Sequence, residues 1–401
     1  MAKLAAAGVV DGYPDGTYKG DRTMTRYEMA QIIARTLAKG AIGADDKLVS
    51  EFADELDNLG VRVAKPEKNA DNVKITSLAR MSCRDSNGAA VTGEHSRSRL
   101  RTDIFFTGEV NDNWHYVTML RNEQFFQGQN ENGEDDTDFQ RAYLDGNIGV
   151  VKVTAGRYNE NINDGNICDT RVDGIKATVP FGNAYFKAEY GKMAGSRDYT
   201  GLYGDAEENA HGYGASTADK FWLAEVGGTW GNFDLFANYL KDANVRGLAL
   251  ASSADPIHDD NIWAVGASYH VGKFGLGAMY VKGDDDVLKG AVDMDGHAAD
   301  DYDDDGYVIK MNWGGARRNE PGSWGLLARY VDLGAPAVIS MSENGESEYT
   351  RFIGEGFKGY KVGGNVTLAK NLIAEVDYYD YKGKETDKHA RTLWSQLYVH
   401  F

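Results

Sequence analysis

Hydrophobic and polar positions alternate one by one from residue 73 to residue 401, in roughly sixteen short stretches. In the last stretch, Leu393, Leu397, Val399 and Phe401 fall on one face, and the polar positions between them fall on the other. A period of two is that of a β-strand. An amphipathic strand that ends the chain on an aromatic residue is typical of an antiparallel barrel that closes in a membrane.

The connections between these stretches alternate between short and long. The short ones are 111–113, 147–149, 182–183, 231–232, 272–273 and 369–371, with 314–323 as a longer exception, and the long polar ones are 85–97, 127–138, 159–170, 191–219, 243–260, 283–305 and 334–350. Outer-membrane barrels have short periplasmic turns, long extracellular loops and an even strand number. The sequence therefore predicts an all-β membrane protein, an antiparallel transmembrane β-barrel of about sixteen strands over residues 73–401, with both barrel ends periplasmic.

The alternation also sorts the side chains of each strand into two faces. Arg or Lys at the bilayer midplane on the lipid face costs ~2–4 kcal/mol, so charged rows mark the interior, and about sixteen strands enclose an aqueous channel. Alternation alone leaves Arg80, Arg121, Arg157 and Arg329 ambiguous; we expect most of them to line the pore, the alternative being rim arginines that extend to headgroups. The predicted pore-lining residues are Arg80, Arg99, Arg101, Asp103, Glu109, Arg141, Glu160, Asp164, Lys187, Glu189, Glu225, Lys310, Arg329, Lys361, Glu375 and Asp377.

The connection 159–170 is the candidate for a segment that folds inward and narrows the channel. Opposed charges across such a constriction would tune ion selectivity. The alternative is an ordinary solvated surface loop. In the first case Glu160, Asp164 and Asp169 are expected to face Arg80, Arg101 and Arg141.

Composition fits a barrel, with 48 Gly, 23 Tyr and only 6 Pro in 401 residues, although a soluble β-solenoid or sandwich is the alternative. The net charge of −18 lies mostly in the long loops and argues against a nucleic-acid partner. The acidic loop 283–306 allows weak binding of a divalent cation such as Ca²⁺, or is simply solvated.

The eight scattered histidines and the two cysteines give no zinc or catalytic spacing, so neither an enzyme, a resident metal nor a cofactor is predicted. Cys83 and Cys168 both map to the extracellular side, where a disulfide and two free thiols are equally open.

Residues 1–40 form a separate helix–loop–helix module. Asp11-Gly12 and 14–16 are turn sequences, and Thr25 with Glu28 fits a capping box at the start of a helix. Met29, Ile32, Ile33 and Thr36 then form an apolar stripe at helical spacing.

The segment Gly8-Val-Val-Asp-Gly-Tyr-Pro-Asp-Gly-Thr-Tyr, followed by Thr25-Arg-Tyr-Glu, resembles the S-layer homology motif. Together with the barrel, the chain resembles the S-layer-homology porins of diderm Firmicutes. That resemblance implies a homotrimeric outer-membrane channel whose periplasmic module binds peptidoglycan or a secondary cell-wall polymer. In the family Thr25, Arg26 and Glu28 match the binding signature. Because capping alone explains Thr25 and Glu28, the candidates for direct ligand contact are Arg26, Asp11 and Asp15.

This chain departs from the family pattern at its start. The family's module begins with an earlier aromatic-rich segment behind a signal peptide, whereas this sequence enters the first helix midway. A fragment or a misplaced gene start would explain this. We expect a half-module of this kind to bind wall polymer weakly or not at all.

Residues 41–72 are predicted to form a helical linker. Val49, Phe52, Leu56, Leu59 and Val63 follow the spacing of a coiled-coil seam, and Pro66 breaks it. The alternative is a single amphipathic helix that folds back on the barrel.

The sequence thus predicts an outer-membrane porin that passes ions and small hydrophilic solutes passively, contacts outer-membrane lipid and lipopolysaccharide, and tethers the membrane to the wall. One alternative is a channel for sugars or oligosaccharides, which an aromatic slide including Tyr185 and Tyr379 would favour. The other is a structural tether with the barrel as anchor, which a plugged lumen would favour.

Overall fold

The computed structural model describes residues 23–38, 47–52, 55–56, 72–91, 95–126, 137–193, 220–246, 257–289, 298, 301–339, 352 and 355–401. The chain divides into two compact units, Met1–Val73 and Lys74–Phe401. The predicted division into three parts at residues 40 and 72 stays a prediction. In the described ranges, no helix has the length and apolarity that a membrane span requires.

The first unit contains helix α2 (Arg26–Ala38), which starts at the predicted capping box. Glu28 N donates to Thr25 Oγ1 at 3.2 Å, and Thr25 N donates to Glu28 Oε2 at 2.8 Å. Each side chain thus satisfies a backbone donor that the helix leaves open. The predicted stripe is only partly right, because α2 buries Ala30 and Ile33 but leaves Met29 exposed.

The short helix α3 (Lys47–Glu51) and the residues after it supply the apolar surface that covers α2. Val49, Phe52 and Leu56 form one buried cluster with Ala30 and Ile33. These three residues belong to the predicted coiled-coil seam. In this chain they are covered by its own helix, so they do not form a seam open to another copy; Leu59 and Val63 lie outside the described residues.

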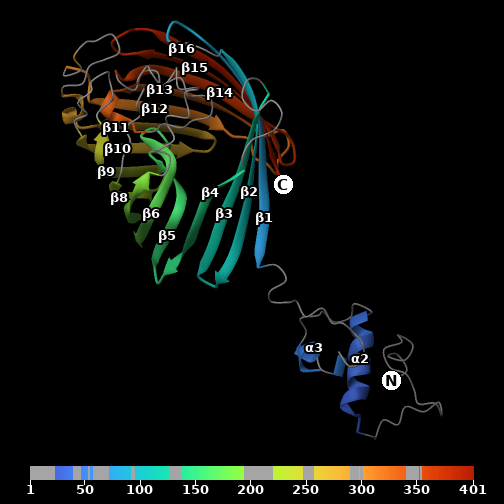
Figure 1. Ribbon diagram of the computed structural model, residues 1–401. Helices are drawn as coiled ribbons and strands as arrows, with labels where there is room; N and C mark the ends of the chain where they lie inside the picture. Colours follow the sequence, from blue (N-terminus) through green and yellow to red (C-terminus); the bar gives the residue numbers. More distant parts are fainter. Residues whose placement is uncertain are drawn as a thin grey trace. The chain divides into compact units, whose positions relative to one another are not determined.

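The second unit is a closed antiparallel barrel of sixteen strands in sequential order, as predicted, with β1 paired to β16 (Figure 1). The strands are β1 (Val73–Asn87), β2 (Ser96–Asn111), β3 (Trp114–Phe125), β4 (Asp138–Ile148), β5 (Val151–Ile162), β6 (Cys168–Phe181), β7 (Ala184–Met193), β8 (Lys220–Trp230), β9 (Phe233–Arg246), β10 (Ile257–Val271), β11 (Phe274–Lys282), β12 (Asp305–Gly314), β13 (Trp324–Leu333), β14 (Phe357–Ala369), β15 (Leu372–Gly383) and β16 (His389–His400). Two 3-10 turns, η2 (Asp285–Leu288) and η3 (Ala335–Ala337), lie in the connections.

The alternation of short and long connections is confirmed. Four of the short turns contain a glycine at φ of 59–64°, namely Gly149, Gly182, Gly231 and Gly272, and Asn371 adopts 66° in the turn before β15. Tight hairpins need such left-handed residues, which glycine and asparagine tolerate best. The connection between β5 and β6 is shorter than predicted, because the two strands stay paired up to Ile162 and Cys168.

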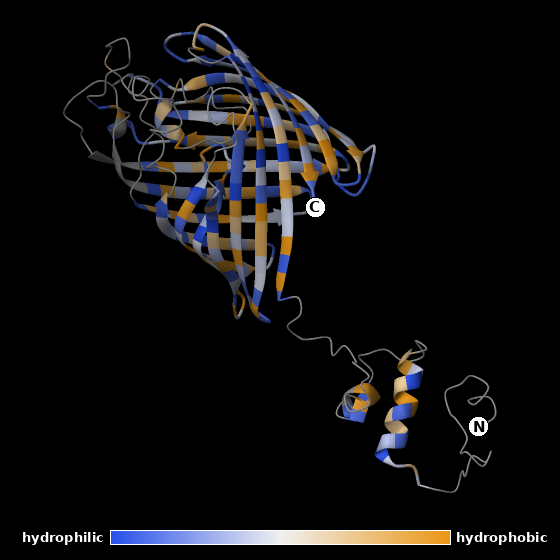
Figure 2. Cartoon of the chain, turned by 45° about the vertical axis from the view of Figure 1, so that its right-hand side comes forward, coloured by the Kyte–Doolittle hydropathy of each residue, from blue (hydrophilic) through white to orange (hydrophobic). Residues whose placement is uncertain are grey.

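Apolar and polar positions alternate along the strands, and Figure 2 shows this as bands of orange and blue. The predicted face assignments hold on β2, β7 and β16, where Leu100, Phe186 and Leu393 lie outside. Of the four ambiguous arginines, Arg80, Arg121 and Arg329 lie inside. Arg157 lies outside, where it faces Asp173 on β6 with two hydrogen bonds of 2.6 and 2.7 Å.

The outer surface carries a row of aromatic side chains, one on each strand from β7 to β15, which we call the outer aromatic row. Several neighbouring rings contact each other, with centroids 4.3 Å apart for Tyr190 and Trp222 and 5.5 Å apart for Trp263 and Tyr280. The row comprises Tyr190, Trp222, Tyr239, Trp263, Tyr280, Tyr307, Tyr330, Tyr360 and Tyr378. Such girdles mark the interface between membrane and water.

Candidate functional site

All of the predicted pore-lining residues on strands lie on the inner face of the barrel. Strand alternation explains this, because register partners share a face and a slip of one residue would reverse every side chain. Arg101 pairs with Glu123, Lys187 with Glu225 and Lys361 with Tyr379 across neighbouring strands. Glu109 also has inward parity but lies exposed beside the turn between β2 and β3.

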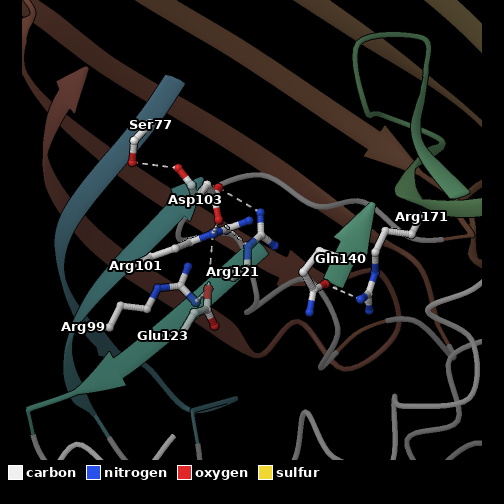
Figure 3. Close-up of polar contacts among 8 residues, drawn as sticks. All are labelled: Ser77, Arg99, Arg101, Asp103, Arg121, Glu123, Gln140 and Arg171. Carbon is white, nitrogen blue, oxygen red and sulfur yellow. Dashed lines mark hydrogen bonds and ion pairs between the residues drawn. The ribbon is translucent and has the colours of Figure 1, made fainter. Parts of the chain in front are cut away.

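An arginine-rich wall forms the inner face of β1–β4. Arg121 donates to both carboxylate oxygens of Asp103, at 2.7 and 3.0 Å, and Arg101 lies 3.4 Å from Asp103 and from Glu123 (Figure 3). Arg99 lies 3.6 Å from Glu123. We call this group the arginine wall; its guanidinium groups are those of Arg80, Arg84, Arg97, Arg99, Arg101, Arg121 and Arg141. Asp103 and Glu123 are acidic partners within this wall, whose guanidinium groups outnumber its carboxylates.

Charges of both signs on β5–β8 form a compact network around Glu160. Lys176 lies 2.5 Å and Lys187 3.3 Å from its carboxylate oxygens, and Lys187 is also 3.3 Å from Glu225. Buried carboxylates need partners of this kind because desolvation is costly. The two lysines thereby form ion pairs with two carboxylates on this wall, Glu160 and Glu225. The network is completed by Glu189, which accepts a hydrogen bond of 2.8 Å from the hydroxyl of Tyr158.

The tip of the hairpin between β5 and β6 turns into the lumen, as predicted for the segment 159–170. Asn163 Oδ1 accepts a hydrogen bond of 2.7 Å from Asn238 on β9. Asp164 lies 3.3 Å from Lys310 on β12, and Asn166 accepts from Arg329 on β13 at 3.3 Å. The tip therefore crosses the interior to strands far from its own.

The predicted charge partners of this segment are wrong. Glu160 and Asp164 bind lysines on β6, β7 and β12 and form no ion pair with Arg80, Arg101 or Arg141. Asp169 has outward parity and accepts a hydrogen bond of 2.6 Å from Asn159. The sequence alone does not identify the ion-pair partners of Glu160 and Asp164, because they depend on how far the hairpin tip extends across the lumen.

Apolar residues pack inside the barrel towards the ends of the strands that carry the long connections. Ile162, Ile167 and Cys168 of the hairpin join inward residues of β8–β13 and the segment around η3 in one buried cluster. Ile339 N donates to Ile167 O at 2.9 Å, which ties the two connections together. Inward loops thus fill part of the lumen with apolar contacts.

Tyr185 and Tyr379, the two inward tyrosines proposed for an aromatic slide, do not form an exposed one. Tyr379 is only 1% exposed within the apolar cluster, and the hydroxyl of Tyr185 donates to Glu225 at 2.8 Å. The observation that would have favoured a sugar channel is therefore not found for these two residues.

A third charged group lies on β14–β16. Lys361 Nζ is 3.2 Å from Asp377 Oδ2, and both side chains are nearly fully buried. Glu375 accepts a hydrogen bond of 2.6 Å from Gln396. The inner wall therefore carries both signs of charge around most of its circumference.

Sequence reasoning missed several inward charges. Arg84 and Arg97 have the same parity as the predicted arginines of their strands, and Glu123 and Lys176 face predicted residues across the ladder. Strict alternation along β1, β2, β3 and β6 could have identified all four.

In the first unit, Arg26 contacts the protein itself. Its Nε lies 2.6 Å from Glu55 Oε1, its Nη2 donates to Glu51 O at 3.1 Å, and its guanidinium lies 4.6 Å from the centre of the Phe52 ring. Thr25 and Glu28 form the helix cap. Asp11 and Asp15 lie outside the described residues, so their contact with a ligand stays a prediction.

The bond to Arg26 holds the pKa of Glu55 below its ordinary value of 4.5. Ionised Glu55 therefore stabilises the packing of residues 47–52 and 55–56 at pH values above 4.5, and this stabilisation is lost as the pH falls through the folded-state pKa. Hydrogen-exchange mass spectrometry of this segment, corrected for intrinsic rates, should show protection falling in acid. Glu55→Gln should show the lower protection already at neutral pH and no step; an unchanged step in this variant would contradict the assignment.

The two cysteines cannot pair in this fold. Cys83 is exposed on β1, where its neighbours Ser82 and Arg84 point inward, and Cys168 is buried in the lumen cluster. They therefore lie on opposite sides of the barrel wall.

In the acidic loop, the carboxylates of Asp284, Asp285 and Asp286 lie close together. Asp284 accepts a hydrogen bond from Asn261, and Asp286 pairs with Lys289, so divalent-cation binding there stays a prediction.

Known structures share this barrel. A Salmonella typhi OmpF in complex with daunomycin aligns over 82% of this chain and 97% of its own, with a TM-score of 0.50 and 12% identity. Pseudomonas putida OprB at high pH aligns over 82% and 94%, with a TM-score of 0.55 and 9% identity. The barrel is of the porin type.

Residues 1–30 match the S-layer homology domain family. Outer membrane protein SlpA of Deinococcus radiodurans is 40% identical over 122 residues, or 27% of this chain and 10% of the relative. SlpA of Thermus thermophilus is 36% identical over 86 residues, or 17% and 9%. The chain spans about a tenth of the length of these relatives. This chain is thus an outer-membrane protein in which an S-layer homology segment precedes a porin-type barrel.

Proposed function

We propose that the barrel is a passive channel for ions and small hydrophilic solutes. The observation that supports this most directly is the inner wall, where buried or half-buried charges of both signs follow β1–β7 and β12–β15 around the inward hairpin. A barrel used only as an anchor has no need for so many inward charges, each of which costs desolvation. The apolar loop cluster narrows the lumen on one side, and the polar path follows the other.

Single-channel recording in a planar bilayer tests this proposal. We expect stable conductance steps that close in thirds if three barrels insert together, and a non-zero reversal potential across a salt gradient because the wall is charged. Folded, inserted protein that passes no current would contradict the channel and leave the anchor function.

We further propose that the barrel forms a homotrimer through the outer face of β16 and β1–β6. The outer aromatic row stops at both edges of this face. At one edge Tyr190 lies opposite Ile175, and the next outward residue on β6 is the charged Asp173. At the other edge Tyr378 lies opposite Leu393 of β16. The outward pair of Arg157 and Asp173 is better covered by protein than by lipid, since charges on a lipid face are costly.

A bulky residue on this face should separate the subunits. Ala155 lies on the outer face of β5 opposite Ile175. Ala155→Trp adds a bulky ring there, which hinders the close approach of a second barrel. We expect the trimer band to be lost in unheated electrophoresis while the folded monomer remains. Ala188→Trp is the matched control, because Ala188 is exposed between Phe186 and Tyr190 where lipid is expected. Loss of the trimer only in the control would place the contact face elsewhere.

The N-terminal segment is proposed to attach the barrel to peptidoglycan or a secondary cell-wall polymer. Of the three candidates for ligand contact, Arg26 is the one that lies within the described residues. The match to the S-layer homology family supports this. Cosedimentation with purified cell walls tests it, and protein that stays entirely in the supernatant would contradict it.

On the outer surface of the barrel, outward charges beside the outer aromatic row, such as Lys192 and Lys241, suit contact with lipid and lipopolysaccharide headgroups.

A further inference from the structure

The inner wall of β4–β7 contains a polar pocket of about 400 Å³. Four cationic side chains and one carboxylate reach it, together with hydroxyl groups of tyrosine and threonine. The lining comprises Arg141, Tyr143 and Asp145 of β4, Lys152, Thr154, Tyr158 and Asn159 of β5, Lys176 and Thr178 of β6, and Lys187 of β7.

The four cations of the pocket differ in how closely carboxylates compensate them. Asp145 is held by Thr154 at 2.7 Å and lies 3.8 Å from Lys152. Glu160 lies beside the pocket and is shared by Lys176 and Lys187. Glu225 also lies 3.3 Å from Lys187, so among the described residues three of the four cations lie within 4 Å of a carboxylate and Arg141 does not.

Arg141 is the cation with the least internal compensation. Among the described residues it forms no ion pair, and its buried Nε has no hydrogen-bond partner. Burying an arginine nitrogen without an acceptor is costly, and an anion in the pocket would supply one. Tyr143 and Thr178 add hydroxyl groups that can donate to the same ligand.

The arginine wall leads to this pocket. Met119, the register partner of Arg141, lies on the same face of β3 as Arg121, which faces Asp103 beside Arg101. Guanidinium groups therefore follow the inner face across four neighbouring strands and end at the pocket. The hairpin acids that could have opposed them are bound to lysines instead. An anion that enters along this side meets an excess of positive charge.

We propose that this pocket binds small multivalent oxyanions, such as solutes with a diphosphate or several carboxylates, as they pass the channel. The proposal rests on the proposed channel function. Planar guanidinium and flexible ammonium groups around one cavity suit an oxyanion with several acceptor atoms. A monovalent halide carries one charge on one atom, so it cannot reach donors on opposite sides of the cavity as a multivalent oxyanion can, and we expect the site to favour such oxyanions over chloride.

Inorganic diphosphate added to single channels in potassium chloride tests the proposal. We expect a reversible reduction of the current that saturates with diphosphate concentration. Arg141→Gln should raise the half-blocking concentration about tenfold, the value for one charge-assisted hydrogen bond. Lys310→Gln removes a lumen cation outside the pocket and is the matched control, in which the half-blocking concentration should stay unchanged.

Isothermal titration of the detergent-solubilised protein with diphosphate gives a readout that needs no current. Conducting channels without block or binding would overturn the pocket and leave the channel proposal standing. Absent current with intact binding would overturn the channel but not the pocket. Equal weakening in the Arg141 and Lys310 variants would assign the effect to the general lumen charge and overturn a local site.

Discussion

Ile309→Arg should destabilise the barrel by ~2–4 kcal/mol, because it places a guanidinium on the lipid face near the middle of β12. Ile309 is 44% exposed on the outer surface, between Tyr307 of the outer aromatic row and Met311. In water such an exposed substitution would change stability little. The size of the effect therefore reports that this band faces hydrocarbon. Urea unfolding in lipid vesicles, followed by tryptophan fluorescence, measures it.

Lys310→Arg is the control for this prediction. It places the same guanidinium one residue further along the same strand but on the inner face, beside Asp164. We expect a change within about 1 kcal/mol, the usual range for an exposed ion pair. If both variants lost the same stability, the outer band of β12 would not be lipid-facing.

The barrel could be predicted from the sequence because alternation constrains every strand independently. On β2, Arg101 and Asp103 alternate with Leu100 and Ile104, and a shift of one residue would expose all the charges to lipid. Turn glycines such as Gly231 fix where one strand ends and the next begins. Local signals therefore suffice for strand number, order and face.

The partners of the charged residues could not be predicted in the same way. Arg157 has the same outward parity as Val153 and Ala155, but the free-energy cost of a lipid-facing arginine favoured an inward prediction. What reverses the argument is Asp173, which lies directly opposite on β6 and has the same parity. Glu160 likewise binds Lys187 of β7 because the hairpin bends inward, a distance in space that strand periodicity does not contain.

In the N-terminal unit, too, the sequence pattern did not predict the packing partner of an apolar face. Val49, Phe52 and Leu56 have the spacing of a coiled-coil seam, and that spacing also suits packing against a helix of the same chain. The structure uses them in the second way, against Ala30 and Ile33 of α2. Spacing gives the apolar face of such a segment but not the surface that covers it.

Lys361→Met should cost ~3–5 kcal/mol of stability, the penalty for leaving one member of a buried ion pair without its partner. The side chains of Lys361 and Asp377 are 8% and 4% exposed, and their charged atoms lie 3.2 Å apart. In the variant, Asp377 keeps a hydrogen bond of 3.2 Å from the hydroxyl of Tyr379 but loses the ammonium group. A neutral hydroxyl compensates a buried carboxylate less well than a cation does.

The double variant Lys361→Met, Asp377→Leu separates the pair from its packing. With both charges removed, the desolvation penalty disappears, so most of the lost stability should return. Arg317→Gln breaks the exposed turn pair with Glu320, whose side chains are 66% and 58% exposed, and should cost no more than about 1 kcal/mol. Urea unfolding in vesicles measures all three. A double variant as unstable as the single one would show that shape, rather than the unpaired charge, limits stability at this position.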